Sequence, residues 1–334
     1  MKHHIQKVAL FMSLLMSQLL TASLAHALEP VRFATDWKAQ AEQGGFYQAK
    51  ALGLYEKAGL DVTIISGGPG VNIPQLLGAG AIDFGMGSNS FIPLNMVQAG
   101  VPAKAVMAAF QKDPQVLITH QRDDIRTLAD MKGKPIMVAD ATINAFWAWL
   151  RVKYGFENKQ IRKYTFNLAP FLVDPKAIQQ GYVTSEPYTI ESRGDTQVQV
   201  FLLADYDYPS YASMVLARTD WIDGKPEKVQ AFVDASIEGW RSYVYGDPTP
   251  GNQLIMQANP EMSADNIAHA IAQMRQRGMV ASGVANNAAI GTMSTARWQE
   301  FFDTMSASGV YPEDLDWRAA FTTQFIAQQA VAAE

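Results

Sequence analysis

The feature that most constrains the fold is a regular alternation of segment types between residues 31 and 88. Apolar runs typical of strands alternate with segments typical of helices, which predicts a strand, a helix, a strand, a helix and a strand. This order is typical of a parallel sheet covered by helices, where ligands bind beyond the carboxyl ends of the strands. The loops at those ends are polar or rich in glycine, namely Asp36-Trp37, Gly67-Gly68-Pro69-Gly70 and Gly87-Ser88-Asn89-Ser90. Since glycine lets the main chain approach a ligand, the three loops together predict a ligand site, although each alone could be an ordinary turn.

The alternation continues along the rest of the chain and contains no repeats. The sequence predicts a helix over 88–100, strands over 103–111 and 115–121, a helix over 127–133, a strand over 135–140, a helix over 142–155 and a strand over 161–167. A long strand over 211–222 is followed by helices only, with Ser263 and Ser294 as N-caps. Two α/β units in tandem predict two lobes.

The first 27 residues have the composition of a signal peptide. Lys2 and Lys7 precede an apolar run from residue 8 to residue 20, and Ala25-His26-Ala27 supplies a small-x-small cleavage site. A membrane-spanning helix needs about 20 apolar residues, which this shorter and interrupted run does not provide. We therefore expect cleavage after Ala27 and a periplasmic protein.

Charge and cysteine content narrow the classes of function. Without Lys2 and Lys7, 25 basic residues face 32 acidic residues, so no polybasic surface for nucleic acid is expected. The sequence has no cysteine, which excludes disulfides, a cysteine nucleophile, a thiolate metal site and an N-terminal lipid anchor on cysteine. A packed core must hold a chain of this length together, and length alone suggests one or two domains.

Most aromatic side chains lie at helical spacing and are interpreted as core. Phe232, Val233, Ile237 and Trp240 form one such face behind Pro226. A second face carries Ile143, Phe146, Trp147 and Leu150. Trp149 lies off that face, so it is expected either at the surface or in a cleft.

The second predicted lobe offers two further polar segments. Asn144 lies where the helix over 142–155 begins, and Asn167 lies at the end of the strand over 161–167. In the segment 181–191, a polar strand end is expected to turn at Pro187 and to present Glu186 and Tyr188 to the opening between the lobes. The alternative is a solvated glutamate at a turn.

The order of three motifs resembles one family in particular. GGFYQAKALGLYEKAGLDV, then a GGP loop, then GAGAIDFGMGSNS is similar to periplasmic solute-binding proteins of ABC importers for thiamine precursors, sulfonates and nitrate. The resemblance implies a type II periplasmic-binding-protein fold, an α/β fold of two lobes joined by two crossover strands with the ligand in the interlobe cleft. On this basis we expect lobe 1 over 28–114 and 220–334, lobe 2 over 115–219, and crossings near 112–120 and 211–222. It also implies a monomer that closes on its ligand and delivers it to a permease driven by a separate ATPase.

The predicted rim favours a flat, nitrogen-rich heterocycle. Carboxylates and amides next to aromatic rings suit a ligand that stacks and donates hydrogen bonds from an amino edge. The resemblance points the same way, to a thiamine-precursor pyrimidine such as hydroxymethylpyrimidine or its formylamino relative. Sulfonate, taurine, nitrate or riboflavin-like ligands are the alternatives. The expected ligand-binding residues are Asp36, Trp37, Gly68, Pro69, Ser88, Asn89, Asn144, Trp147 (or Trp149), Asn167, Glu186 and Tyr188.

An enzyme of the same fold is the less favoured alternative. Fungal hydroxymethylpyrimidine phosphate synthases, which the resemblance also includes, use a histidine in the first loop and a cysteine-rich iron site. Here Gln43 stands where that histidine would be expected, and no cysteine exists. His120 and His269, the histidines left after cleavage, have no carboxylate at metal-ligand spacing. We therefore expect no cofactor, no metal and no catalysis, while a sensor or scaffold role stays open.

Overall fold

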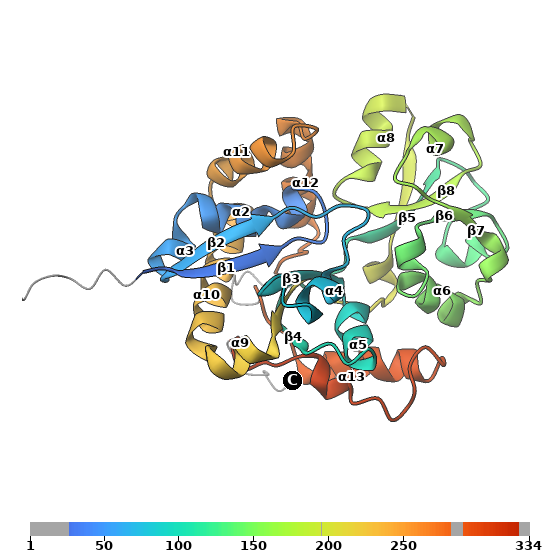
Figure 1. The fold of residues 1–334 in the computed structure, drawn as a ribbon. Coiled ribbons are helices and arrows are strands. Elements are labelled where there is room, and N and C mark those ends of the chain that lie inside the picture. Colours follow the sequence, from blue (N-terminus) through green and yellow to red (C-terminus); the bar gives the residue numbers. More distant parts are fainter. Residues whose placement is uncertain (1–26, 195, 282–289, 327–334) are drawn as a thin grey trace, which may run out of the picture.

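The structure, a computed structural model, describes residues 27–194, 196–281 and 290–326. Residues 1–26, most of the predicted signal peptide, lie outside the described residues. The described chain forms two lobes, each built on its own five-stranded sheet (Figure 1). In the part of the chain that the structure describes, no helix is long and apolar enough to cross a membrane.

The first sheet has the order β2-β1-β3-β10-β4. Its first three strands are parallel, as the alternation over 31–88 predicts, and β10 runs antiparallel between β3 and β4. The carboxyl ends of β1, β2 and β3 therefore meet at one edge, facing the second lobe (Figure 1). The strands are β1 (Glu29–Ala34), β2 (Leu60–Ile65), β3 (Phe84–Asn89), β4 (Ala103–Phe110) and β10 (Ala212–Arg218).

The second sheet has the order β7-β6-β8-β5-β9. β6 is parallel to β7 and β8, and β5 runs antiparallel to both of its neighbours. The strands are β5 (Gln115–His120), β6 (Ile136–Val138), β7 (Ile161–Lys163), β8 (Ile178–Tyr182) and β9 (Val198–Leu202). The sequence analysis missed β9 and placed only the end of β8.

The chain passes between the sheets twice. The first passage lies over residues 111–114, between β4 and β5, and the second lies over residues 203–211, between β9 and β10. The expected crossing at 211–222 and the expected extension of lobe 2 to residue 219 are therefore wrong. β10 pairs with β3 and β4, so the apolar run over 212–218 belongs to the first sheet.

Helices cover both sheets, and most follow the predicted positions. The first lobe carries α2 (Gly44–Ala51), α3 (Leu54–Lys57), α4 (Ile73–Gly78), α5 (Phe91–Gln98), α9 (Thr219–Gly224), α10 (Pro226–Tyr245), α11 (Thr249–Ala258), α12 (Ala264–Gln276) and α13 (Thr295–Ser306). The second lobe carries α6 (Phe146–Tyr154), α7 (Ala169–Val173) and α8 (Glu186–Gly194). Ser263 and Ser294 accept hydrogen bonds from the backbone NH of Asn266 and Arg297, which confirms both N-caps.

Three local predictions need correction. The segment 127–133 forms only a short 3-10 turn over Leu128–Met131, and the strand predicted over 161–167 ends at Lys163. The segment 181–191 is not a strand that turns at Pro187. β8 ends at Tyr182 and α8 begins at Glu186, because proline is well tolerated in the first turn of a helix.

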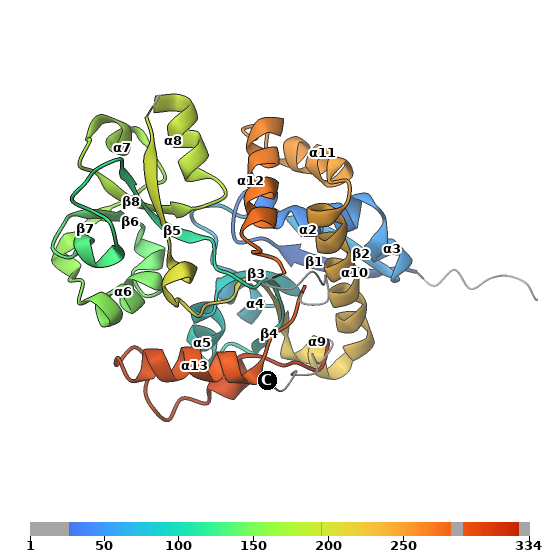
Figure 2. The same ribbon diagram turned by 180° about the vertical axis from the view of Figure 1, so that it is seen from behind.

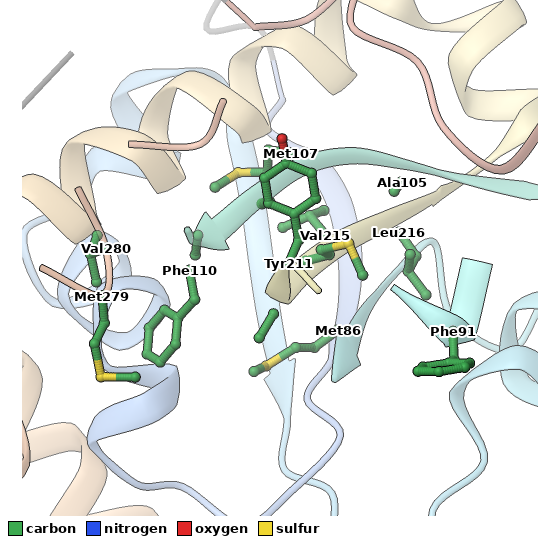
Figure 3. Close-up of a cluster of buried hydrophobic side chains, with 14 of the residues drawn as sticks. Met86, Phe91, Ala105, Met107, Phe110, Tyr211, Val215, Leu216, Met279 and Val280 are labelled. Carbon is green, nitrogen blue, oxygen red and sulfur yellow. The ribbon is translucent and has the colours of Figure 1, made fainter. Parts of the chain in front are cut away.

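The core of the first lobe is aromatic and closely packed. Phe232 on α10 stacks on Phe84 of β3 with ring centroids 4.4 Å apart, and Trp240 meets Phe46 of α2 edge to face at 5.6 Å. β3, β4 and β10 carry a further buried cluster that includes Met86, Met107, Phe110 and Val215 (Figure 3). On the predicted helical face, Phe232, Val233 and Trp240 are thus core, as predicted, and Ile237 is partly buried and packs against that core.

Glycines allow α2 and α10 to approach closely. A Cβ atom on Gly45 would lie 2.2 Å from the Trp240 ring, and one on Gly239 would lie 2.3 Å from the carbonyl oxygen of Gly45. Gly44 is similarly close to Tyr243. The GG pair in the GGFYQ motif therefore serves helix packing.

We expect Gly239→Ala to destabilise the protein by about 1–3 kcal/mol, because the new methyl group meets backbone atoms that have no room to yield. Chemical denaturation would measure the loss. Gly224→Ala is the matched control, because a Cβ atom there meets nothing within 4 Å. It should change the free energy of unfolding by no more than about 0.5 kcal/mol. Equal effects of the two substitutions would contradict the close approach.

Candidate ligand site in the interlobe cleft

The loops after β1 and β2 are joined directly at the edge of the first sheet. The backbone NH of Gly67 donates to the carbonyl of Trp37 at 3.1 Å and to Oγ1 of Thr35 at 3.2 Å. A Cβ atom on Gly67 would lie 2.2 Å from the Thr35 carbonyl oxygen. Gly67 is therefore required to bring the two loops together, whereas Gly68 has open space around its Cα atom.

Asp36 has one carboxylate oxygen in use and one free. The hydroxyl of Ser88, on β3, donates to Oδ2 of Asp36. Oδ1 is buried and accepts no hydrogen bond from the residues that the structure describes. Burial raises the pKa of Asp36 to about 6, although Ser88 above all, and also the nearby backbone NH groups and the side chain of Gln43, oppose this shift. Asp36 and Ser88 are thus brought together as predicted, and Oδ1 is left to serve another donor.

Glu42 is a second buried carboxylate, and the sequence analysis missed it. It precedes α2 and accepts a hydrogen bond from the hydroxyl of Thr184, which lies in the second lobe between β8 and α8. Glu42 is 3% exposed. Burial raises its pKa, and the hydrogen bond from Thr184 opposes this rise. Repulsion from the charges of Glu186 and Asp36 raises the pKa further. This contact with Thr184 bridges the two lobes.

Glu186 contributes a third carboxylate, from the start of α8. Its Oε2 accepts a hydrogen bond from the backbone NH of Tyr182 at 2.7 Å and another from the hydroxyl of Ser185 at 2.6 Å. Burial raises its pKa, and these hydrogen bonds oppose the rise. Glu186 is therefore no solvated turn residue, but Oε2 is already used to hold the segment between β8 and α8.

Tyr182 lies near four carboxylates, and the sequence did not identify it as a site residue. Burial raises the pKa of its phenol well above the usual value, and the negative charges of Asp113, Asp36, Glu42 and Glu186 add to the effect in that order. We call the four carboxylates, Asp36, Glu42, Asp113 and Glu186, the acidic cluster. Among the described residues no three histidine, aspartate or glutamate side chains converge as metal ligands.

A pair of aromatic rings spans the cleft beside the acidic cluster. Trp37, from the first lobe, contacts Phe166, from the second, with ring centroids 4.6 Å apart and a tilt of 53°. Phe166 follows β7 with φ of 61° and remains 40% exposed, so part of its ring is available for stacking. The neighbouring Asn167 does not share this position, because its Oδ1 accepts from the backbone NH of Ala169 at the start of α7.

Tyr188 belongs to α8, which lies beside α12 of the first lobe (Figures 1 and 2). It stacks on His269 of α12 with ring centroids 4.5 Å apart and 25° between the planes. Tyr188 therefore contacts the opposite lobe. The other histidine, His120, is structural, because its Nε2 hydrogen-bonds the Phe171 carbonyl in the interior of the second lobe.

Several predicted site residues lie elsewhere. Trp147 is fully buried, donates from Nε1 to Asn158 and packs on Phe156, so it presents no surface to a ligand. Trp149 is also buried, next to Tyr208. Neither Trp147 nor Trp149 is therefore exposed to a ligand, so the prediction that one of them would be is wrong. Asn89 uses Oδ1 to cap α5 through the backbone NH of Phe91, and Pro69 is exposed.

Asn144 lines a different space between the lobes, which we call the α5–α6 cavity. This open cavity of about 710 Å³ is lined by residues of α5, of α6 and its flanking segments, and of the segment 307–311. Its polar lining comprises Asn95, Gln98, Asn144, Arg151, Ser308 and Tyr311. Arg151 makes no ion pair with any described residue.

The missed residues left partial signals in the sequence. Glu42 lies in the AEQGG segment that the sequence analysis examined only for a histidine, and Tyr182 lies four residues before Glu186. Phe166 is adjacent to Asn167. Polar or aromatic residues near the end of a strand correctly indicated the region of the site. Which residue of each segment takes part depended on where β7 and β8 end, and the sequence did not predict those ends.

The comparison with known proteins agrees with this architecture. The sequence matches the family described as "NMT1/THI5 like" over residues 40–249. The chain belongs to this family. The match runs from the loop before Glu42 through both lobes and beyond β10, so it includes the residues of the acidic cluster other than Asp36.

Two curated proteins are similar to the chain over most of its length. The riboflavin-binding protein RibY of Chloroflexus aurantiacus is 23% identical over 236 residues, which cover 69% of this chain and 66% of that protein, just under two thirds of its length. The formylaminopyrimidine-binding protein of Halalkalibacterium halodurans is 23% identical over 241 residues, which cover 70% of this chain and 72% of that protein.

A solved structure identifies the fold. The periplasmic aliphatic sulphonate binding protein SsuA from Escherichia coli superposes with a TM-score of 0.67 and 17% sequence identity, covering 88% of this chain and 92% of that one. The predicted two-lobed periplasmic-binding-protein fold is therefore confirmed. At this identity the likeness concerns the fold and leaves the ligand open.

The raised pKa of Asp36 predicts how stability depends on pH. The folded protein binds this proton more tightly than the unfolded chain, whose aspartates have pKa values near 3.8. The stabilisation is complete below the unfolded pKa and is lost as pH rises through about 6. We expect the ligand-free protein to melt at a higher temperature near pH 5 than at pH 7.5, as measured by calorimetry. Asp36→Asn should reduce this difference, and a parent-like pH profile in the variant would contradict the assignment.

Proposed function

We propose that this protein is the solute-binding component of an ABC importer, and that it captures a small nitrogen-rich heterocycle in the cleft between its lobes. The observation that carries the proposal is the acidic cluster with the unpaired, buried Oδ1 of Asp36. A buried oxygen without a donor is unfavourable, and a ligand NH group would supply the missing hydrogen bond. Closure of both lobes around such a ligand would let a membrane permease distinguish the loaded protein from the empty one.

The electrostatics favour a neutral or cationic ligand over an anion. All four carboxylates of the cluster have raised pKa values because burial disfavours their charge. An amino group or a protonated ring nitrogen would offset that charge, whereas a sulfonate or nitrate would add to the repulsion. The family match and the formylaminopyrimidine-binding relative support a thiamine-precursor pyrimidine as the ligand.

Aromatic contacts support the same ligand class. Trp37 and Phe166 offer ring surface from opposite lobes beside the acidic cluster. A flat pyrimidine that stacked on these rings would place its exocyclic amine near the carboxylates. A flavin would use the same two features with a larger ring, in line with the riboflavin-binding relative.

The second candidate is the binding of an anionic ligand such as a sulfonate, and the α5–α6 cavity favours it. Arg151 and the amides of Asn95, Gln98 and Asn144 line that cavity from both lobes. The SsuA-like fold is compatible with such a ligand. A pyrimidine phosphate synthase activity has no comparable support, because the described site presents no metal-binding cluster and Gln43 uses Oε1 to accept from the backbone NH of Gln40.

Asp36→Asn is the sharpest test of the ligand class. We expect it to weaken binding of 4-amino-5-hydroxymethyl-2-methylpyrimidine by about tenfold to a hundredfold, since hydrogen bonds to charged groups contribute roughly 1.5–3 kcal/mol. Isothermal titration calorimetry would measure the change. Asp61→Asn is the control, because it alters net charge equally at an exposed position on β2.

Two outcomes of that experiment would count against the proposal. If Asp36→Asn binds the pyrimidine as tightly as the parent, the unpaired oxygen is not a ligand contact. If the parent prefers methanesulfonate or taurine, and Arg151→Ala abolishes that preference, the anionic candidate is correct.

Export is tested separately. We propose a periplasmic location and a signal peptide that ends at Ala27, from the pattern of the first 27 residues. Protein recovered from the periplasm should begin at Leu28, as determined by intact-mass spectrometry. Cytoplasmic protein that retains Met1 would contradict both the location and the importer role.

A further inference from the structure

Arg297 connects the two passages between the lobes to a single helix. It lies in the first turn of α13, which belongs to the first lobe (Figure 1). Its Nη2 donates to the carbonyl of Gln111, in the first passage, at 2.7 Å. The same guanidinium donates to the carbonyls of Pro209 and Ser210, in the second passage, both at 2.9 Å. One side chain therefore holds both passages.

The surroundings of Arg297 keep it in that position. Its guanidinium carbon lies 3.9 Å from the centroid of the Tyr211 ring, and the Tyr211 hydroxyl accepts a hydrogen bond from the backbone NH of Ser294 at 3.0 Å. Figure 3 shows Tyr211 next to the buried cluster of the first sheet. Burial lowers the pKa of Arg297, and Tyr211, then Glu300, then Asp113 in the first passage act against that shift.

An arginine is required for this set of contacts. Its planar fork presents five NH donors, so it can bind carbonyls that approach from two chain segments at once. A lysine has three donors on a flexible stem and no planar surface to lie on Tyr211. The contacts are also with the backbone, so they fix where the two passages run whatever their side chains are.

We propose that Arg297 is a positioning residue for lobe closure: it fixes the two passages side by side on the first lobe and so sets the range of interlobe angles that the protein adopts. The argument rests on the proposed function only in that closure serves ligand binding. Without Arg297, the passages would still connect the lobes, but their relative positions would vary more. Apparent affinity falls in proportion to the share of molecules that can close correctly.

The test uses spin labels in the ligand-free protein. The cysteine-free sequence allows label cysteines at Arg193 of α8 and Asp265 of α12, exposed positions on the two helices that face each other across the cleft. Pulsed electron–electron distance measurements should give a broader interlobe distribution for Arg297→Ala and for Arg297→Lys than for the parent. Arg275→Ala is the matched control, because Arg275 also binds backbone carbonyls, those of Val244 and Gly246, but within the first lobe.

Each outcome decides the proposal. A distribution for Arg297→Lys as narrow as that of the parent, at a similar melting temperature, would overturn it even if Arg297→Ala does not fold. An equal broadening in Arg275→Ala would also overturn it, because the effect would then be general loosening of the lobe. A calorimetric titration with 4-amino-5-hydroxymethyl-2-methylpyrimidine should show about a tenfold weaker Kd if only about a tenth of the molecules remain able to close. The distance measurement needs no ligand, so it stands if the pyrimidine assignment fails.

Discussion

The way in which the chain crosses between the two sheets is the constraint on which the rest of the structure depends: each passage leads directly into an interior strand of the other sheet. β5, which follows the first passage, enters the second sheet antiparallel to both neighbours, and β10, which follows the second passage, does the same in the first sheet. Each passage therefore connects a strand of one sheet to an interior strand of the other. Because interior strands are held on both sides, any motion between the lobes would have to occur within residues 111–114 and 203–211. The division into two lobes and the role of Arg297 both follow from these two crossings.

The acidic cluster gains its properties because its residues come from both lobes and from one of the passages between them. Asp36 and Glu42 come from the first lobe, Glu186 comes from the second, and Asp113 lies in a passage. Carboxylates from separate lobes approach one another when the cleft narrows, and their mutual repulsion rises as water is excluded. The cluster is thus least favourable in a closed, empty protein. In the proposed function, a ligand that brings NH donors or positive charge would remove that penalty, so the same charges that oppose closure of the empty protein would favour closure of the loaded one.

Local patterns in the sequence predicted the parallel unit and most helices, but not the path of the chain between lobes. The alternation over 31–88 and the serine N-caps at 263 and 294 depend on neighbours in sequence, and they were confirmed. The apolar run over 212–218 would fit the interior of either sheet, so its composition alone did not reveal that β10 returns to the first lobe. Short strands such as β9 have too little periodicity to detect. Trp147 and Trp149 show the same limit, because every residue of α6 from 146 to 150 is buried, whichever side of the helix it lies on.

The site was predicted best where one residue both ends a strand and carries charge. Asp36 and Ser88 follow or end neighbouring parallel strands, so topology alone brings them together. Glu42 and Tyr182 enter the cleft through contacts between lobes, which no local pattern encodes. Asn89 and Asn167 illustrate the opposite error, since an amide after a strand is often used to cap the next helix. A polar residue at a strand end is free to contact a ligand only if the following helix does not use its side chain, and Oδ1 of Asp36 meets that condition most clearly among the predicted site residues.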